Sequence, residues 1–456
     1  MQRLQCPGDY PKWVDSHSSS SEFIELLNPN FSVHPSNFSS LMLFGLSLCN
    51  YTLMYWANIF LAQHLSVNAF DDFNVAVSVV TLLSTFATLG LEKYALRLVA
   101  LYMERENWPR LLGFWKFSLA TILLFSFVLM GLTNVGLTIV LAWHNAESHT
   151  ATLLYTLFLP AIALCLYLTE AITVFGAQIL ALVLYRLVLP TVFFLLIIVL
   201  HGSQAEMTAE AVMICLGSAW VLTLFMMLLA AHVASPKAIN QVKADYHGKR
   251  WWLKNSLPLL LSSLMMTLLM TAGTILLATC HAPPTTVGIY AVAMKSSGFL
   301  ALLGTSTNRY YLPMLIVLVE RRDLTGINEL LNKRTIFIGG LIMLFLCLIS
   351  IWGLEILALF GPTFSKGYWT LLISSVGGAF MTLFSDSLYY LQFMNRNRLV
   401  IGLLSLAAIS TLVLGYSLGS TYGATGMAIA YALPTITLFS SLKWLARRHM
   451  MQFIAG

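Results

Sequence analysis

Long apolar runs separated by short polar breaks occupy most of the chain after residue 40. A helix needs about 20 apolar residues to cross the hydrocarbon core of a bilayer. Runs of that length or longer occur at roughly 41–62, 73–101, 112–142, 152–174, 178–200, 211–233, 256–280, 286–318, 336–359, 368–391, 399–418 and 424–445. This pattern predicts an all-α polytopic membrane protein with about 12 transmembrane helices.

The charged residues between these runs differ in sign from gap to gap. Lys and Arg gather in the even-numbered gaps, with Lys333 and Arg334 in the eighth, and again after the last run. The odd-numbered gaps hold one basic residue, Lys366, and the acids Asp71, Asp72, Glu147, Glu206 and Glu210. Because cytoplasmic loops are rich in Lys and Arg, both termini are predicted to lie in the cytoplasm.

The longest internal polar stretch, 235–255, is basic and lies near the midpoint of the chain. It divides the protein into two predicted six-helix bundles, 41–234 and 256–446. A polar cytoplasmic extension, 1–40, precedes them, and a cytoplasmic tail, 447–456, follows. Two similar halves are typical of alternating-access transporters, which bind their substrate between the halves.

Composition excludes several function classes. Hydrophobic residues make up 58% of the chain and charged residues only 10%, against about 25% charged in a soluble domain. The net charge of +6 is spread over short loops without a dense basic stripe, so no nucleic-acid partner is expected. Walker A and HExxH motifs are absent, and the six cysteines form no metal-ligand spacing. We therefore expect no enzyme activity, no metal and no cofactor.

Three basic residues, Arg186, Lys295 and Arg309, lie within apolar runs. A charge at the centre of a membrane helix costs about 3 kcal/mol unless it faces a wet cavity or a partner. A cationic cavity suits an anionic substrate, especially a phosphate or pyrophosphate. On one continuous helix, Lys295 and Arg309 would share a face about 21 Å apart. Arg186 lies near a cytoplasmic helix end, where its side chain would also reach the headgroups.

Acidic residues form the complementary set: Glu170, Asp386 and Glu92. A carboxyl group inside the membrane binds a coupling proton or sodium ion, or it neutralises a nearby base. The sequence leaves these two interpretations open.

Four short pieces of sequence recur in one family at corresponding places. They are 88–100 (TLGLEKYALRLVA), 287–295 (VGIYAVAMK), 360–367 (FGPTFSKG) and 422–430 (YGATGMAIA). In this order and at these spacings, residues 40–446 resemble the polysaccharide flippases, including the O-antigen flippases. These belong to the multidrug/oligosaccharidyl-lipid/polysaccharide exporter superfamily.

The resemblance implies both a fold and a function. Family members form two six-helix bundles in a V. They move undecaprenyl-pyrophosphate-linked oligosaccharides across the bacterial inner membrane for surface polysaccharide biosynthesis, including lipopolysaccharide and exopolysaccharide. Lys295 matches the basic position of the family's G-x-Y-x-x-A-x-K piece, whereas Arg186 and Arg309 rest on the cavity argument alone. The implied partners are the lipid-linked oligosaccharide, membrane lipids, a coupling ion (H⁺ or Na⁺) and a polysaccharide polymerase complex.

Four alternatives stay open. An ion-coupled multidrug antiporter of the same superfamily would have an acidic cavity for cationic substrates, whereas the deep charges here are mostly basic. A lipid II flippase usually has two more helices. A membrane glycan polymerase or ligase, which is an enzyme, typically has a long outer loop, but the outer gaps here span only about five to ten residues. A scaffold without transport activity would not explain charges within the membrane.

Overall fold

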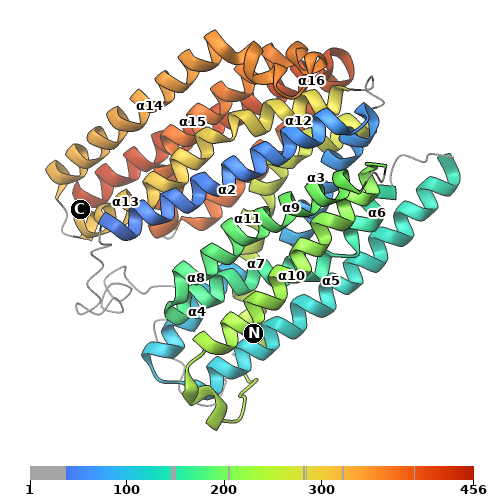
Figure 1. Cartoon of the computed structure of the whole chain (residues 1–456). Coiled ribbons are helices and arrows are strands. Elements are labelled where there is room, and N and C mark those ends of the chain that lie inside the picture. The colour runs from blue at the N-terminus through green and yellow to red at the C-terminus, as the bar shows by residue number, and fades with distance from the viewer. Residues whose placement is uncertain are drawn as a thin grey trace.

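The computed structural model describes residues 37–144, 150–203, 206–280, 283, 285–320, 323–394 and 396–455. Within these ranges the regular secondary structure is helical, and no strand occurs. The helices form two inclined groups. Most of the N-terminal half lies in the lower part of Figure 1, and most of the C-terminal half, together with the first described helix (37–64), lies in the upper part. Most of the predicted N-terminal extension, residues 1–36, lies outside the described ranges.

The first half contains α2 to α10. Its helices are α2 (Asn37–His64), α3 (Val67–Ala87), α4 (Leu91–Glu104), α5 (Trp108–His144), α6 (Thr150–Thr156), α7 (Leu159–Ile172), η2 (Thr173–Ala177), α8 (Gln178–Val183), η3 (Leu184–Val188), α9 (Leu189–Gly202) and α10 (Ala209–Ala234). The linker contains η4 (Lys237–Gln241). The second half consists of α11 (Lys249–Thr279), α12 (Thr286–Ser297), α13 (Phe299–Glu320), α14 (Leu324–Ala358), η5 (Pro362–Gly367), α15 (Tyr368–Phe393) and α16 (Asn397–Ala455).

In the described ranges, 9 helical segments are long and apolar enough to cross a membrane. Two of them, Leu159–Gly202 and Asn397–Met450, have 44 and 54 residues. As straight helices they would measure about 66 and 81 Å, far beyond the roughly 30 Å hydrocarbon core. Each is broken by a glycine with positive φ, Gly176 (90°) and Gly423 (57°), between two of the predicted spans. The predicted all-α polytopic membrane fold is confirmed.

Large apolar side chains cover much of the outer surface. Val233 is 82% exposed, Ile336 76% and Leu124 68%. Of the most apolar stretch of α5, only 11% is buried within the protein. An apolar surface of this extent is expected where lipid tails, rather than water, surround the helices.

The first helix of each half lies at the junction between the halves. α2 packs on η3 and α9 of its own half, and also on α13. Figure 1 shows α2 running alongside the second half. Correspondingly, α11 packs on α16 and also on α3 and α4. The domain boundaries predicted at 41–234 and 256–446 remain predictions, but α2 and α11 each contact both groups.

The basic linker is attached to the first half. The Asp245 amide donates to the Pro109 carbonyl at 2.9 Å, and the Arg110 guanidinium lies 3.4 Å from the Asp245 carboxylate. The buried indole of Trp252, on the first turn of α11, donates to the Tyr102 hydroxyl at 3.1 Å. These contacts place the start of α11 against the predicted cytoplasmic end of the first half.

Gly90 joins α3 and α4 and allows α11 to pass closely. Its φ of 71° lies in the left-handed region, which non-glycine residues rarely adopt. A Cβ atom at this position would lie 2.5 Å from both the Leu260 amide nitrogen and the Ser256 carbonyl oxygen. Both atoms belong to the backbone of α11, so neither can move aside without a shift of the helix.

We predict that Gly90→Ala destabilises the protein by about 2–4 kcal/mol, because backbone strain adds to overpacking. The thermal unfolding temperature in detergent measures this effect. Gly402→Ala is the matched control, since a Cβ there meets nothing within 4 Å. The control should unfold at or slightly above the wild-type temperature, because Ala favours helix. Equal unfolding temperatures for the two variants would contradict the close packing of α11 on Gly90.

Candidate functional site

Lys295 links the two halves through amide oxygens. It lies on α12, and its ammonium donates to the Asn74 side-chain carbonyl of α3 at 2.6 Å and to the Asn58 side-chain carbonyl of α2. The ammonium nitrogen also lies 5.4 Å from the ring centroid of Phe73 and 6.0 Å from that of Phe70. The lysine belongs to the second half, and all four of these partners belong to the first.

The Lys295 cation therefore has dipoles and ring faces as its described partners, and no carboxylate. The amide groups of Asn58 and Asn74 are held in place because each side-chain nitrogen donates to the backbone of its own helix, at 2.6 Å to Met54 and 2.7 Å to Phe70. An ammonium has three N–H donors, of which the asparagines take two. A ligand could therefore engage this ammonium at its third donor or in place of an asparagine.

Two tyrosines of α2 lie beside this lysine. The Tyr51 hydroxyl donates to the Lys295 backbone carbonyl at 2.9 Å, and the Tyr55 hydroxyl lies 2.9 Å from the Ser296 hydroxyl. Their rings stack with centroids 5.8 Å apart. The surroundings of the cation thus combine hydroxyl groups and aromatic faces, both of which suit sugars next to a phosphate.

The two halves meet at the predicted outer end of the protein. There the Asp71 carboxylate of α3 accepts from the amides of Gly288 at 2.7 Å and Thr285 at 3.1 Å, at the start of α12. A carboxylate at a helix N-terminus satisfies free amides and complements the helix dipole. Gln63 donates to the Leu359 carbonyl at 2.7 Å. These contacts close the outer end.

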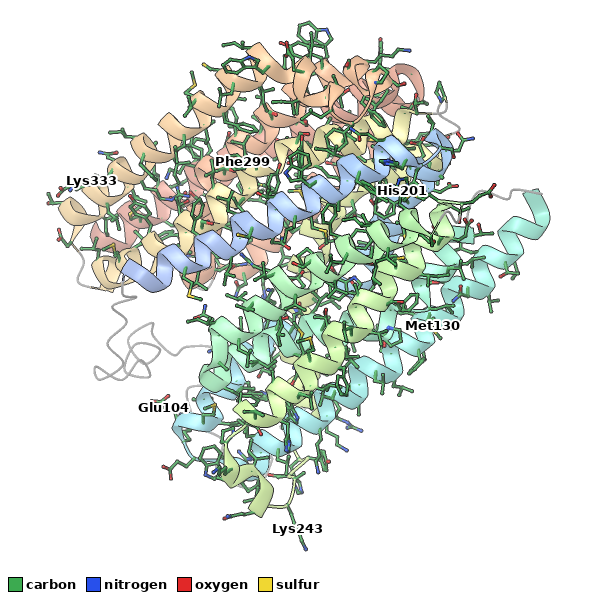
Figure 2. The ribbon with its side chains drawn as sticks, in the orientation of Figure 1. Glu104, Met130, His201, Lys243, Phe299 and Lys333 are labelled. Atoms are coloured by element: carbon green, nitrogen blue, oxygen red, sulfur yellow. The ribbon has the colours of Figure 1, made fainter. Side chains whose placement is uncertain are left out.

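The opposite ends of the halves diverge. In Figure 1, α4 and α8 run away from α13 and the start of α2. Figure 2 shows Glu104 of the first half and Lys333 of the second far apart at this end, whereas His201 lies towards the closed end. Lys295 lies about nine residues from the outer start of α12, or about 13 Å below the closed end. With the predicted orientation, this geometry corresponds to a form closed to the outside.

The other two predicted basic residues have different surroundings. Arg186 lies in the π-helical turn η3, and its guanidinium contacts the Ser47 hydroxyl of α2. Arg309 lies on α13, and its side chain is outside the described residues. The predicted single helix 286–318 is two helices that meet at Gly298. The shared face of Lys295 and Arg309 therefore remains a prediction.

The three predicted acids lie in three environments. Glu170 forms an ion pair with Lys93 at 3.0 Å, across α7 and α4. Glu92 is 7% exposed, and its Oε2 atom has no hydrogen-bond partner among the described residues. Asp386 is 4% exposed and lies between two cations, Arg334 at 3.0 Å and Lys443 at 3.1 Å.

Arg334 corrects one sequence-based expectation. It was expected in the polar gap before the ninth span, but it is 1% exposed within α14. Besides Asp386, its guanidinium donates to the Leu383 carbonyl at 2.9 Å and the Asn308 side-chain carbonyl at 2.8 Å. The helix α14 starts at Leu324, twelve residues before the apolar run at 336–359. Arg334 therefore lies on the helix, where its side chain packs inside the bundle. The sequence did contain one indication of a buried cation, because Asp386 lies inside a predicted span and a buried carboxylate requires a cation nearby.

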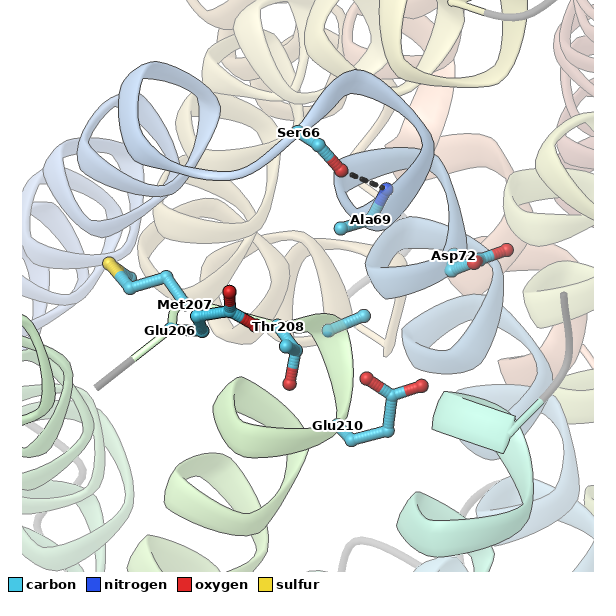
Figure 3. A pocket seen from close by; sticks show the side chains of 8 residues that line it. Ser66, Ala69, Asp72, Glu206, Met207, Thr208 and Glu210 are labelled. Atoms are coloured by element: carbon cyan, nitrogen blue, oxygen red, sulfur yellow. Dashed lines mark hydrogen bonds between the residues drawn. The ribbon is translucent and has the colours of Figure 1, made fainter. Parts of the chain in front are cut away.

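A cavity of about 390 Å³ lies between the starts of α3 and α10. Figure 3 shows three carboxylate residues around it, Asp72, Glu206 and Glu210, and the Ser66 hydroxyl that caps α3. Its acidic lining does not suit a phosphate. Among the described residues, no group of three or more His, Cys, Asp or Glu could hold a metal ion.

Sequence comparisons find no relatives. No protein-family profile matches the chain. No curated protein matches it.

Comparison with solved structures gives a clear result. An inward-facing multidrug-resistance MATE family transporter of the MOP superfamily superposes with a TM-score of 0.72 at 12% identity, covering 91% of this chain and 98% of the other. The lipid II flippase MurJ, in an inward closed conformation, gives 0.71 at 13% identity, covering 91% and 90%. The chain has the fold of the MOP-superfamily transporters. The resemblance seen in the sequence is therefore confirmed at the level of the superfamily fold.

The MOP fold does not fix the polarity of the binding pocket. A MOP-superfamily transporter from Pyrococcus furiosus superposes with a TM-score of 0.60 at 12% identity, covering 91% of this chain and 95% of the other. Its binding pocket is described as having reverse polarity, which suggests a different function for that transporter. Both neighbours named above are in inward conformations, in line with the outer-end contacts of this chain. The fold therefore does not identify the substrate, and the residues of the site have to indicate its charge.

We predict that Asp71→Ala opens the outer end. Loss of a helix cap costs about 1–2 kcal/mol, which changes a two-state ratio roughly 5- to 30-fold. Spin labels at positions 64 and 366, both exposed, in a cysteine-free background report the distance across this end. The variant should gain a longer-distance population. Asp72→Ala, the matched control one residue away, should keep the wild-type distribution, and unchanged distances in Asp71→Ala would show that the cap does not hold the halves together.

Proposed function

We propose that this protein is a flippase for an undecaprenyl-pyrophosphate-linked oligosaccharide in the bacterial inner membrane. It works by alternating access, with both termini in the cytoplasm, and serves surface polysaccharide biosynthesis. The proposal rests on the position and the partners of Lys295. This cation lies where the two halves meet, and amide oxygens take the place of a counter-ion.

The charge of the site favours an anionic substrate. A buried ammonium is costly unless an opposite charge approaches it, so a phosphate gains a charge-assisted hydrogen bond and relieves that cost. A cationic drug would meet repulsion at the same place. This difference favours the flippase over the ion-coupled multidrug antiporter. The name MurJ, a lipid II flippase, shows that lipid-linked substrates occur within this fold.

Binding and closure compete for the same donors. The two asparagine bonds of Lys295 join α12 to α2 and α3. A pyrophosphate that reaches Lys295 from the cytoplasmic side would replace these bonds, so the halves would lose one of their connections. Binding thus favours the form in which the outer end opens, because the ligand has a higher affinity for it. Arg186 and Arg309 would guide the pyrophosphate on its way, while the lipid tail stays in the bilayer.

A coupling ion would drive the return step. Glu92 suits this role, because it is buried and one of its oxygen atoms lacks a described partner. Glu170 is held by Lys93, and Asp386 is held between two cations, so both are better suited to stabilise the bundles. The coupling ion would be H⁺ or Na⁺. The flipped product would pass to a polysaccharide polymerase complex in the outer leaflet.

We predict that Lys295→Gln abolishes surface polymer formation. Removal of one charge-assisted contact to phosphate should weaken substrate binding about 10- to 100-fold. A deletion strain is complemented with each variant, and the lipid-linked repeat units and their leaflet are quantified. Lys333→Gln, an exposed lysine paired with Glu329 on one helix, is the matched control. The control should restore export, while Lys295→Gln should leave the repeat units in the inner leaflet at equal protein level.

Other results would favour other functions. Full export by Lys295→Gln would contradict a role of this cation in substrate binding. Single repeat units in the outer leaflet of the deletion strain would favour a polymerase. No lipid-linked intermediate, together with increased sensitivity to cationic dyes, would favour the antiporter.

A further inference from the structure

A small pocket with basic side chains at its wall lies inside the second half, between α13, α14, α15 and α16. The residues at its wall include Leu315, Leu331, Asp386, Ser387, Tyr390, Lys443 and Arg447. Leu315 follows Lys295 by 20 residues along α12 and α13, which corresponds to about 30 Å. This pocket is therefore distinct from the junction site.

Two buried hydroxyl groups in this pocket lack partners. Ser387 is 1% exposed and Tyr390 4% exposed, and both line the cavity. Neither hydroxyl has a hydrogen-bond partner among the described residues. Buried polar groups in proteins are nearly always hydrogen-bonded, so an occupant of the cavity should accept these two bonds.

The charges around the pocket are predominantly positive. Asp386 is the one acid at its wall, and both of its oxygens are already engaged, one by Arg334 and one by Lys443. Arg447 adds a further cation at the wall. The occupant that suits this balance is an anion. The cavity holds about 10 Å³, room for about one water-sized atom, so it admits one oxygen of a larger anion whose remainder stays at the mouth.

The end of α16, which supplies Arg447 to the pocket wall, has the features of a membrane interface. Arg447 and Arg448 lie exposed on the last turns of α16, in the strongly basic region that the charge pattern places in the cytoplasm. Trp444 is 61% exposed, and the Arg448 guanidinium lies 5.6 Å from its ring centroid. Tryptophan concentrates at the headgroup level, and basic pockets between membrane helices on the cytoplasmic side bind anionic headgroups.

We propose that this pocket binds the phosphate of an anionic glycerophospholipid from the cytoplasmic leaflet. One non-bridging phosphate oxygen enters the cavity and accepts from the hydroxyls of Ser387 and Tyr390. Lys443 and Arg447 neutralise the phosphate charge. The bound lipid would join α15 to α16 next to the Arg334–Asp386–Lys443 network and so stabilise the second half. This site is independent of the substrate proposed above.

Native mass spectrometry of the full-length protein from detergent tests this site. The protein is titrated with phosphatidylglycerol, with phosphatidylcholine of the same acyl chains, and with inorganic phosphate. Arg447→Ala should lower the affinity of one phosphatidylglycerol about tenfold, which is typical of the loss of a charge-assisted contact. Arg448→Ala is the matched control, because it removes the same charge one residue away and outside the pocket wall. It should leave this affinity within about twofold of wild type.

Tyr390→Phe provides a second test that retains the ring and every described ion pair of Asp386. It should also weaken binding several-fold, since one hydrogen bond to a charged group is lost. If Arg447→Ala and Arg448→Ala lowered the affinity for phosphatidylglycerol equally, the lipid would bind to a general basic surface, and the proposal would be overturned. Equal affinity for phosphatidylcholine would overturn the preference for an anionic lipid. Displacement of the bound phosphatidylglycerol by millimolar inorganic phosphate at the same site would overturn the assignment to a lipid.

Discussion

The structure depends on one constraint, an ammonium group that has no carboxylate partner among the described residues and lies where the two halves meet. Lys295 of the second half is held by Asn58 and Asn74 of the first. Amide dipoles stabilise a cation less than a carboxylate does. The two asparagines therefore hold the lysine in place but compensate its charge only in part. The same contacts keep the halves together. In the proposed function, this one side chain therefore links the packing of the halves to transport.

Several other features are arranged around this junction. Asp71 caps α12 from the opposite half, so the helix that carries Lys295 is fixed at its outer start. Gly90 lets α11 pass within backbone contact of the break between α3 and α4. The linker is attached to α5, which sets where α11 begins. Each of these contacts involves backbone atoms, which restricts how the halves can move relative to each other.

The sequence was sufficient to predict the class of fold, because span length and charge asymmetry are strong physical signals. It also identified Lys295 and Asp386 as charges that require an explanation. It did not reveal their partners. Asn58 and Asn74 are common polar residues in apolar runs, and only the three-dimensional arrangement brings them to one lysine. Arg334 was missed for a different reason: α14 is longer than its apolar stretch, so a residue that looked like a loop base is buried.

The MOP fold occurs in a multidrug-resistance transporter and in a lipid II flippase, so the fold alone leaves the substrate open. The charge at the junction is the basis for our proposal of an anionic substrate. The most direct test uses purified protein in proteoliposomes with a fluorescent undecaprenyl-pyrophosphate oligosaccharide, whose exposure in each leaflet is followed with a membrane-impermeant quencher. Wild-type protein should move the lipid across the bilayer, and Lys295→Gln should not. Equal translocation by the two proteins, or by protein-free vesicles, would contradict the central claim.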